Sequence, residues 1–229
     1  LFKIWAIGGA IVLSVSLLFG VILTSGIRGK KFFRAVIYLP NLVSAVALAT
    51  MWLQYVYSSK FGLLKSILDA VGMHKLAETA WLDTDHKFGA LLFAYCFGMI
   101  GYHMLIWMSG IERISPELYE AATIDGANRR QTFFHIVLPL IAPTGGIIAI
   151  LCAINSLKVF DIVKTMTEGG PYYATDVIAT YVYRTAFSSE IGMPRLGYAS
   201  AAALFFGGAV IIIGILLNAM KDRLQKNVQ

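Results

Sequence analysis

The sequence has few charged residues. Only 14% of its 229 residues are Asp, Glu, Lys or Arg, whereas 58% are hydrophobic. A soluble globular domain carries about 25% charged residues, so this composition excludes an ordinary soluble protein. A chain this apolar has to place its surface against lipid or other subunits, which favours a membrane protein.

Cysteine is scarce, and no catalytic or metal-binding constellation is present. Cys96 and Cys152 both lie in long apolar runs, where a free cysteine behaves as a small hydrophobic residue. The four histidines show no zinc-ligand spacing, and we interpret His103 as a packed or cavity-lining residue. We therefore predict no disulfide, no metal site, no catalytic site and no cofactor bound by this chain.

A nucleotide-binding loop and a nucleic-acid patch are also missing. The segment 26–30 superficially resembles a phosphate loop, but the spacing G-x-x-x-x-G-K-[ST] fails. The net charge of +6 comes from bases that flank the apolar runs, as the positive-inside rule expects. We expect neither ATP hydrolysis by this chain nor a nucleic-acid partner.

Five apolar runs are long enough to cross a hydrocarbon core, which takes about 20 helical residues. They are Ile4–Thr24, Ala35–Tyr57, Phe88–Ile111, Leu138–Phe160 and Leu196–Met220. Helix is the expected conformation because lipid leaves exposed backbone groups unpaired. The sequence predicts an all-α polytopic helical bundle that forms a single domain over residues 1–229.

The distribution of Lys and Arg predicts the orientation. The connections on one side carry ten of these residues and those on the other side seven, and a tight cluster at 28–34 lies against two spans. We assign the richer side to the cytoplasm of a bacterial cytoplasmic membrane. The C-terminus is then cytoplasmic and Leu1 external, so we expect a sixth span upstream and no signal peptide.

The connection 58–87, on the predicted outer side, contains a candidate amphipathic helix over Gly62–Val71. Its apolar residues recur at helical spacing. An interfacial helix that lies on the membrane is the favoured interpretation.

The connection Glu112–Val137, on the predicted inner side, is unlike an ordinary hairpin. Ser115 precedes Pro116 as an N-cap, and a helix is predicted from Pro116 to about Ile124. Asp125 and Gly126 break it, and Asn128 begins a second helix with Gln131 in capping-box spacing. Two short helices joined at a glycine suit docking on a soluble partner.

At this point the sequence resembles the EAA motif of ABC importer permeases, EAA-x3-G-x9-I-x-LP, with every defined position present. The matching residues are Glu120, Ala121, Ala122, Gly126, Ile136, Leu138 and Pro139, and Asp125 belongs to the wider match. The resemblance implies the fold of a type I ABC importer transmembrane domain. It also implies that the loop 112–137 is a coupling helix that contacts an ATPase subunit, where Glu120, Ala121, Ala122 and Gly126 carry the contact.

A second set of motifs resembles the maltose-type carbohydrate permeases, in the first of their two paired subunits. The motifs are K-x-F-D from Lys158, T-x-GGP from Thr167 and Y-x-Y-x-x-A-F from Tyr181. The large outer domain of the maltose subunit is missing. The resemblance implies a second permease subunit in a heterodimer, two ATP-binding cassette subunits that use ATP and Mg, an extracytoplasmic solute-binding protein and a carbohydrate substrate.

Several polar residues near the predicted outer side are candidates for the translocation path. They are Gln54, Asn155, Lys158, Asp161, Tyr181 and Tyr183. Lys158 is predicted to lie inside a span, where a charge is costly and faces a cavity or a partner. Alternatively, Lys158 and Asp161 only neutralise each other, and neither interpretation of this pair is preferred. For the tyrosines, we favour the alternative that they form an interfacial aromatic belt.

Two alternatives stay open. A proton-coupled secondary transporter would need acidic groups within the spans, and Asp161 at a boundary is the sole candidate. In the fourth span, Pro143 with Gly145 and Gly146 predicts either a hinge for alternating access or close helix packing.

Overall fold

A computed structural model describes residues 2–83, 85–170, 172–187 and 193–226, with side chains through residue 215. The described residues form helices and no strand. The membrane-crossing and inner elements are η1 (Ile4–Gly8), α1 (Gly9–Thr24), α2 (Lys30–Leu42), α6 (Lys87–Ile111), α7 (Pro116–Ile124), α8 (Arg129–Thr132), η3 (Phe133–Val137), α9 (Leu138–Leu157) and α12 (Leu196–Lys226). The remaining elements are α3 (Ala45–Met51), η2 (Trp52–Val56), α4 (Leu63–Ala70), α5 (His74–Ala77), α10 (Asp161–Thr167) and α11 (Ile178–Phe187).

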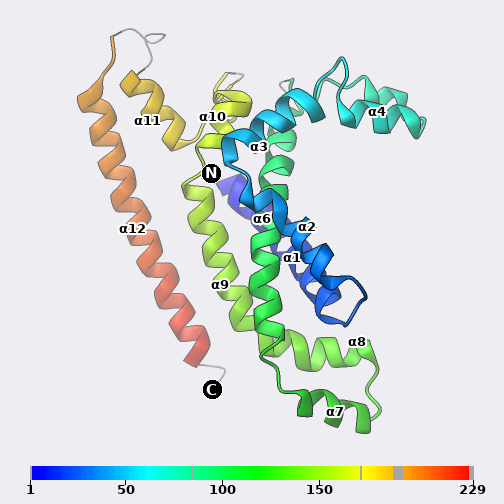
Figure 1. The fold of residues 1–229 in the computed structure, drawn as a ribbon. Coiled ribbons are helices and arrows are strands. Elements are labelled where there is room, and N and C mark those ends of the chain that lie inside the picture. The colour runs from blue at the N-terminus through cyan, green and yellow to red at the C-terminus, as the bar shows by residue number, and fades with distance from the viewer. Residues whose placement is uncertain (1, 84, 171, 188–192, 227–229) are drawn as a thin grey trace.

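The long helices stand side by side and separate the short ones into two ends (Figure 1). α6 packs against α1, α2 and α9, and α12 packs against α9 and α11. α7 and α8 lie at one end, towards which the last turns of α12 also point (Figure 1). α4, α10 and α11 lie at the opposite end. We call these the elbow end and the outer end.

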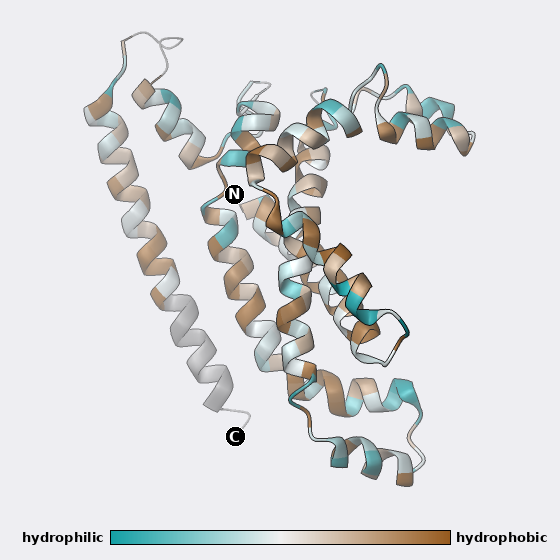
Figure 2. Ribbon diagram, in the orientation of Figure 1, coloured by the Kyte–Doolittle hydropathy of each residue, from teal (hydrophilic) through white to brown (hydrophobic). Residues whose placement is uncertain are grey.

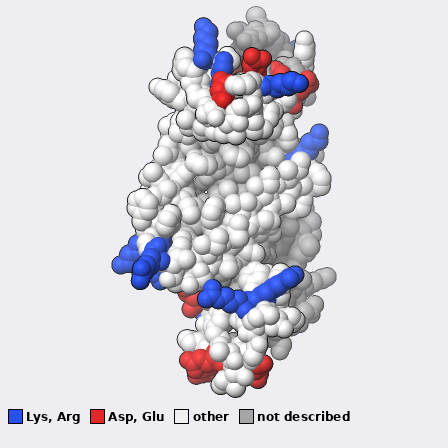
Figure 3. Space-filling view, turned by 90° about the vertical axis from the view of Figure 1, so that its right-hand side faces the viewer, with Lys and Arg blue, Asp and Glu red and all other residues white. Residues whose placement is uncertain are grey.

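Four helices are long and apolar enough to cross a membrane: Ile4–Thr24, Lys87–Ile111, Arg129–Leu157 and Leu196–Ile215. They coincide with four of the predicted spans to within a few residues, apart from the earlier start at Arg129. Figure 3 shows that Lys, Arg, Asp and Glu gather towards both ends of the face it views, with an uncharged band around the middle. The fold is therefore that of a membrane protein.

The second predicted span, Ala35–Tyr57, is not one straight helix. Helices Lys30–Leu42 and Ala45–Val56 meet at an angle of 100° and together pass as one broken span. Pro40 lies in the last turn of α2, where its ring removes a backbone donor. Val43 is extended, and the Ser44 side chain accepts a hydrogen bond from the Ala47 amide at 3.3 Å to start α3.

The fourth span is longer than predicted and has no break. Arg129–Leu157 forms a single 29-residue helix that passes through Pro143. A Cβ atom added at Gly145 would lie 2.8 Å from the indole ring of Trp107. This contact favours the interpretation of the Pro143–Gly146 segment as close helix packing.

The one histidine within the predicted spans has polar neighbours. His103 is fully buried, and its Nδ1 lies 2.8 Å from the Met99 carbonyl oxygen. Its Nε2 lies 3.7 Å from Sγ of Cys152. His103 is therefore a packed residue, as its position in an apolar run predicts.

Gly101 generates a prediction, because α2 crosses α6 at this residue. A Cβ atom there would collide with the backbone of Ile37 and Tyr38, whereas Gly89 in the same helix faces open space. We expect Gly101→Ala to lower the free energy of unfolding by about 1–3 kcal/mol, since backbone atoms yield little to overpacking. Gly89→Ala should leave stability unchanged or raise it by up to about 1 kcal/mol.

Thermal unfolding followed with a thiol-reactive dye measures this difference, because Cys96 and Cys152 are both buried. Equal melting temperatures for the two variants would contradict the predicted contact.

Candidate functional site

The elbow consists of α7, α8 and the turn between them, below the ends of α6 and α9 (Figure 1). α7 begins where the sequence predicts, with Ser115 at the N-cap position and Pro116 in the first turn. The Ser115 side chain makes no capping hydrogen bond, so that detail of the prediction is wrong. The proline, with its preset φ, and Glu117 near the positive end of the helix dipole are the features that favour this start.

The turn of the elbow has two defined hydrogen-bonding motifs. Gly126 has φ 75°, and the amides of Gly126 and Ala127 donate to the carbonyls of Thr123 and Ala122 at 3.1 and 2.9 Å. This is a Schellman motif, which a glycine in the left-handed region completes. Asn128 and Gln131 then form the predicted capping box, with both hydrogen bonds at 2.9 Å.

The two faces of α7 differ in exposure. Ala122 is only 4% exposed, and Tyr119 is half-buried on the same face. The interpretation of Ala122 as a surface that admits a partner's backbone is therefore wrong in this chain, because Ala122 packs inward. Glu120, Ala121 and Asp125 are exposed, as a docking role requires.

A residue that the sequence interpretation missed completes this outer face. Ile124 is 85% exposed at the end of α7, well away from the apolar belt. Glu117, Glu120 and Asp125 lie within one or two turns of it on the same short helix. An aliphatic side chain with an acidic surround suits a partner surface that is apolar at its centre and basic at its rim. The sequence does carry a signal for this exposed residue: Ile124 lies between Thr123 and Asp125 and does not belong to a periodic series of apolar residues.

A cavity of about 580 Å³ separates the elbow from the membrane-crossing helices. Tyr119 and Thr123 of α7, Thr24 of α1 and Ile111 of α6 contribute to its lining. Partial burial raises the pKa of the Tyr119 hydroxyl above its ordinary value. The inner face of the elbow thus forms one wall of this cavity, and the ends of α1 and α6 form another.

The last residues of the predicted motif lie on the helix that leaves the elbow. Ile136 lies in the π-helical segment η3, and Leu138 and Pro139 begin α9. All three belong to the continuous helix Arg129–Leu157. One continuous helix therefore joins the elbow to the outer end.

At the outer end of the same helix, three of the predicted path residues come together. Asn155, Lys158 and Asp161 line a cavity of about 310 Å³, together with Pro40 and Asn41 from α2. Asn41 also donates a hydrogen bond from Nδ2 to the Gly98 carbonyl oxygen at 3.1 Å. The sequence interpretation missed Asn41, which only the crossing of α2 over α6 brings to this cavity.

Lys158 differs from its prediction in two ways. It is the C-cap of α9 rather than a residue inside the span, because α9 ends at Leu157. Among the ion pairs of the described residues, none joins Lys158 to Asp161. Both side chains are exposed, so mutual neutralisation does not explain them.

A second cavity adjoins Lys158 on its other side. It measures about 690 Å³ and is lined by Lys158, Phe160, Tyr183 and residues of α12. The Phe160 and Tyr183 rings are 5.5 Å apart, and Lys164 Nζ lies 5.4 Å from the Tyr183 ring centre. Lys158 and Phe160 therefore line both cavities.

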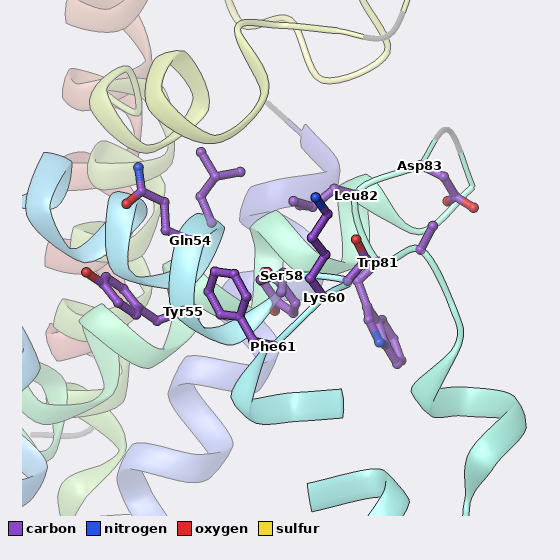
Figure 4. Close-up of a pocket in the computed structure, with 12 residues that line it drawn as sticks. Gln54, Tyr55, Ser58, Lys60, Phe61, Trp81, Leu82 and Asp83 are labelled. Atoms are coloured by element: carbon purple, nitrogen blue, oxygen red, sulfur yellow. The ribbon is translucent and has the colours of Figure 1, made fainter. Parts of the chain in front are cut away.

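The remaining path candidates lie elsewhere. Gln54 lines a separate cavity of about 690 Å³ beside Tyr55, Phe61 and Trp81, which come from η2 and two outer loops (Figure 4). Tyr57 is buried, and its hydroxyl donates to the Ala90 carbonyl oxygen at 3.1 Å, so its role is structural.

Tyr181, on α11, lines none of these three cavities. Within the described ranges, no group of three His, Cys, Asp or Glu side chains is placed to hold a metal ion.

The loop between α10 and α11 is fastened by side chains that no pattern singled out. Arg184 Nη2 lies 2.7 Å from Asp176 Oδ2, and both side chains are largely buried. The guanidinium also stacks 4.1 Å from the centre of the Tyr173 ring. The hydroxyls of Thr175 and Thr167 are 2.8 Å apart. These contacts hold the loop beside the Phe160–Tyr183 cavity.

Comparisons with known proteins agree with this architecture. The family described as "Binding-protein-dependent transport system inner membrane component" matches residues 16–229. The chain is 32% identical over 236 residues to the multiple sugar-binding transport system permease protein MsmF of Streptococcus mutans, covering 98% of this chain and 76% of that protein. It is 30% identical over 194 residues to the diacetylchitobiose uptake system permease protein NgcF of Streptomyces coelicolor, covering 84% and 54%.

A solved structure shows the same fold. A chain of a bacterial alginate ABC transporter, in complex with an alginate pentasaccharide-bound periplasmic protein, superposes with a TM-score of 0.85 at 23% identity. The match covers 98% of this chain and 77% of that one. This chain spans about two thirds of the length of the curated relatives that it matches.

The capping box generates the prediction for the elbow. Asn128→Ala removes the acceptor for the Gln131 amide, and such a loss costs about 1 kcal/mol, equal to about fivefold in exchange rate. We expect faster hydrogen–deuterium exchange at residues 131–132, with the core of α6 unchanged. Asn128→Asp keeps the acceptor and should retain protection. Equal exchange in Asn128→Ala and the unmodified protein would contradict the capping role.

Proposed function

The chain belongs to the family of binding-protein-dependent transport system inner membrane components, and we propose that it is one permease subunit of an ABC importer for carbohydrates. The observation that carries the proposal is the position of the elbow and the Lys158 cavities at opposite ends of one helix. At 1.5 Å per residue, the 29-residue helix spans about 43 Å. The helix thus links a docking surface to a polar path across the membrane.

The elbow supplies the contact with the ATPase subunit. Glu120, Ala121 and Ile124 face outward from α7 and dock on an ATP-binding cassette subunit, which binds ATP and Mg. Ile124 fills an apolar recess, and the acidic side chains meet basic residues at its rim. Closure of the ATPase pair on ATP then displaces α7. Its buried face, with Tyr119 and Ala122, transmits the displacement to the spans.

The outer cavities supply the polar path. Asn41, Asn155 and Lys158 offer hydrogen-bond donors, Asp161 offers acceptors, and Tyr183 offers a ring face. Sugars bind through this combination of directed hydrogen bonds and apolar ring contacts. The names of MsmF and NgcF, which describe a sugar-binding transport system and a diacetylchitobiose uptake system, support a carbohydrate substrate.

The remaining partners follow from the same scheme. The chain pairs with a second permease subunit, and a pair of ATPases binds at the elbow end. A solute-binding protein delivers the sugar at the outer end, in line with the periplasmic protein that accompanies the alginate transporter in its solved complex. We place the elbow and the C-terminus in the cytoplasm, because the tight basic cluster at 28–34 follows Thr24 and Ser25, which line the elbow cavity.

Ile124 gives a direct test of the docking surface. Ile124→Asp should lower ATP-driven uptake at least tenfold and weaken retention of the ATPase during purification. An 85% exposed side chain contributes little to the fold, so the melting temperature of the chain should not change. Ile124→Leu keeps an aliphatic group and should retain most of the uptake. Uptake at the unmodified rate by the Ile124→Asp transporter in proteoliposomes would refute the docking role.

Lys158 gives a test of the path. Lys158→Met removes the cation that lines both outer cavities while it preserves the length of the side chain. We expect sugar uptake to fall at least tenfold while the ATPase stays bound, since the elbow is at the other end. Lys87→Met, at the start of α6 on the same side, is the control and should stay within twofold. Similar uptake by both variants would remove Lys158 from the path.

A further inference from the structure

Residues 58–78 form an arm that leaves the bundle sideways at the outer end (Figure 1). The arm contains α4 and α5, with a turn at Gly72, and α4 packs against α5 and η2. It carries no residue of the Lys158 cavities. The proposed transport cycle therefore leaves the role of the arm unassigned.

One side of α4 is apolar and unpartnered in this chain. Leu63, Ile67 and Val71 recur at intervals of four residues and are 57%, 51% and 69% exposed. Leu64 and Leu68 adjoin this stripe and are half-buried. Full burial of one exposed aliphatic side chain is favourable by about 1.5–3 kcal/mol of free energy, so burial of the whole stripe is strongly favoured.

The direction of the stripe identifies what covers it. In Figure 2 the apolar side of the arm is turned towards the level of the membrane-crossing helices, and its hydrophilic side is turned away from them. In Figure 3 the charged groups of the outer end gather at the top of the molecule, above an uncharged band. The stripe therefore faces the level of the uncharged band.

The polar residues of the arm fit the same placement. Lys65 and Asp69 occupy the side of α4 opposite the stripe, and Lys65 Nζ donates to the Ser59 carbonyl oxygen at 3.1 Å. Lys60, at the root of the arm, carries an exposed ammonium group beside the exposed ring of Phe61. Long Lys side chains keep their charge at the headgroup level while their stems cover apolar surface.

We infer that the arm is an interfacial anchor that seats Leu63, Ile67 and Val71 in the outer lipid leaflet. An amphipathic helix parallel to the membrane buries its apolar face about 5–10 Å into the boundary between headgroups and acyl chains. The anchor fixes the height of the loop 58–61, which forms one wall of the cavity around Gln54 (Figure 4). Insertion of the stripe into lipid requires neither the substrate nor the ATPase.

The test compares two positions on opposite sides of α4. An environment-sensitive fluorophore is attached to Ile67→Cys on the stripe or to Asp69→Cys on the polar side. The native Cys96 and Cys152 are buried, and the unsubstituted protein reports any background labelling. The assembled transporter is reconstituted in vesicles of phosphatidylcholine and phosphatidylglycerol with a nitroxide-labelled acyl chain. We expect at least twofold stronger quenching at position 67 than at position 69.

A probe at Val71→Cys repeats the measurement on the same stripe, so a local disturbance at one site does not decide the result. Equal quenching at positions 67, 69 and 71 would overturn the anchor. Loss of quenching at 67 and 71 when the solute-binding protein is added would also overturn it, because a protein would then cover the stripe. Neither readout requires transport, so failure of the anchor is distinct from failure of the proposed importer function.

Discussion

The architecture depends on one continuous helix, Arg129–Leu157. In lipid, backbone amide and carbonyl groups have no water to bind, so a membrane-crossing helix resists local unfolding. The helix stays continuous through a π-helical turn at Phe133–Val137 and through Pro143, which has no backbone N–H to donate. In the proposed transport cycle, this continuous helix connects the elbow with Lys158.

The two ends of this helix are built by different means. The elbow is held by local motifs, namely a Schellman turn at Gly126 and a capping box at Asn128, which give it a fixed shape before any partner binds. The outer cavities are held by contacts between segments that are distant in sequence, such as the contact of α10 with α3. A rigid docking surface and a cleft assembled from several elements suit the proposed transporter, in which a displacement at the elbow changes the access of substrate to the outer cavities.

The second helix pair serves the outer cleft in a way that a straight span would not. Across the 100° bend at residues 43–44, Ala45 and Leu48 of α3 line the same cavity as Pro40 and Asn41 of α2 and Lys158. The same bend directs η2 and the arm away from the bundle (Figure 1). One interruption of helical hydrogen bonding thus shapes the cavity at its inner side and positions the arm at its outer side.

The sequence by itself determined the helical class, four of the spans, and the helices, turn and capping box of the elbow. Each of these depends on hydrophobic run length or on side chains within a few residues of one another. The tertiary structure decided which face of α7 is buried, because only the packing of the elbow turns Ala122 inward and leaves Ile124 exposed. It also decided that Lys158 ends a helix and has no ion pair with Asp161, and that Gln54 and Tyr181 lie away from the Lys158 cavities. Such features depend on contacts between distant segments, and the residues of one segment carry no signal for the distance or direction of another.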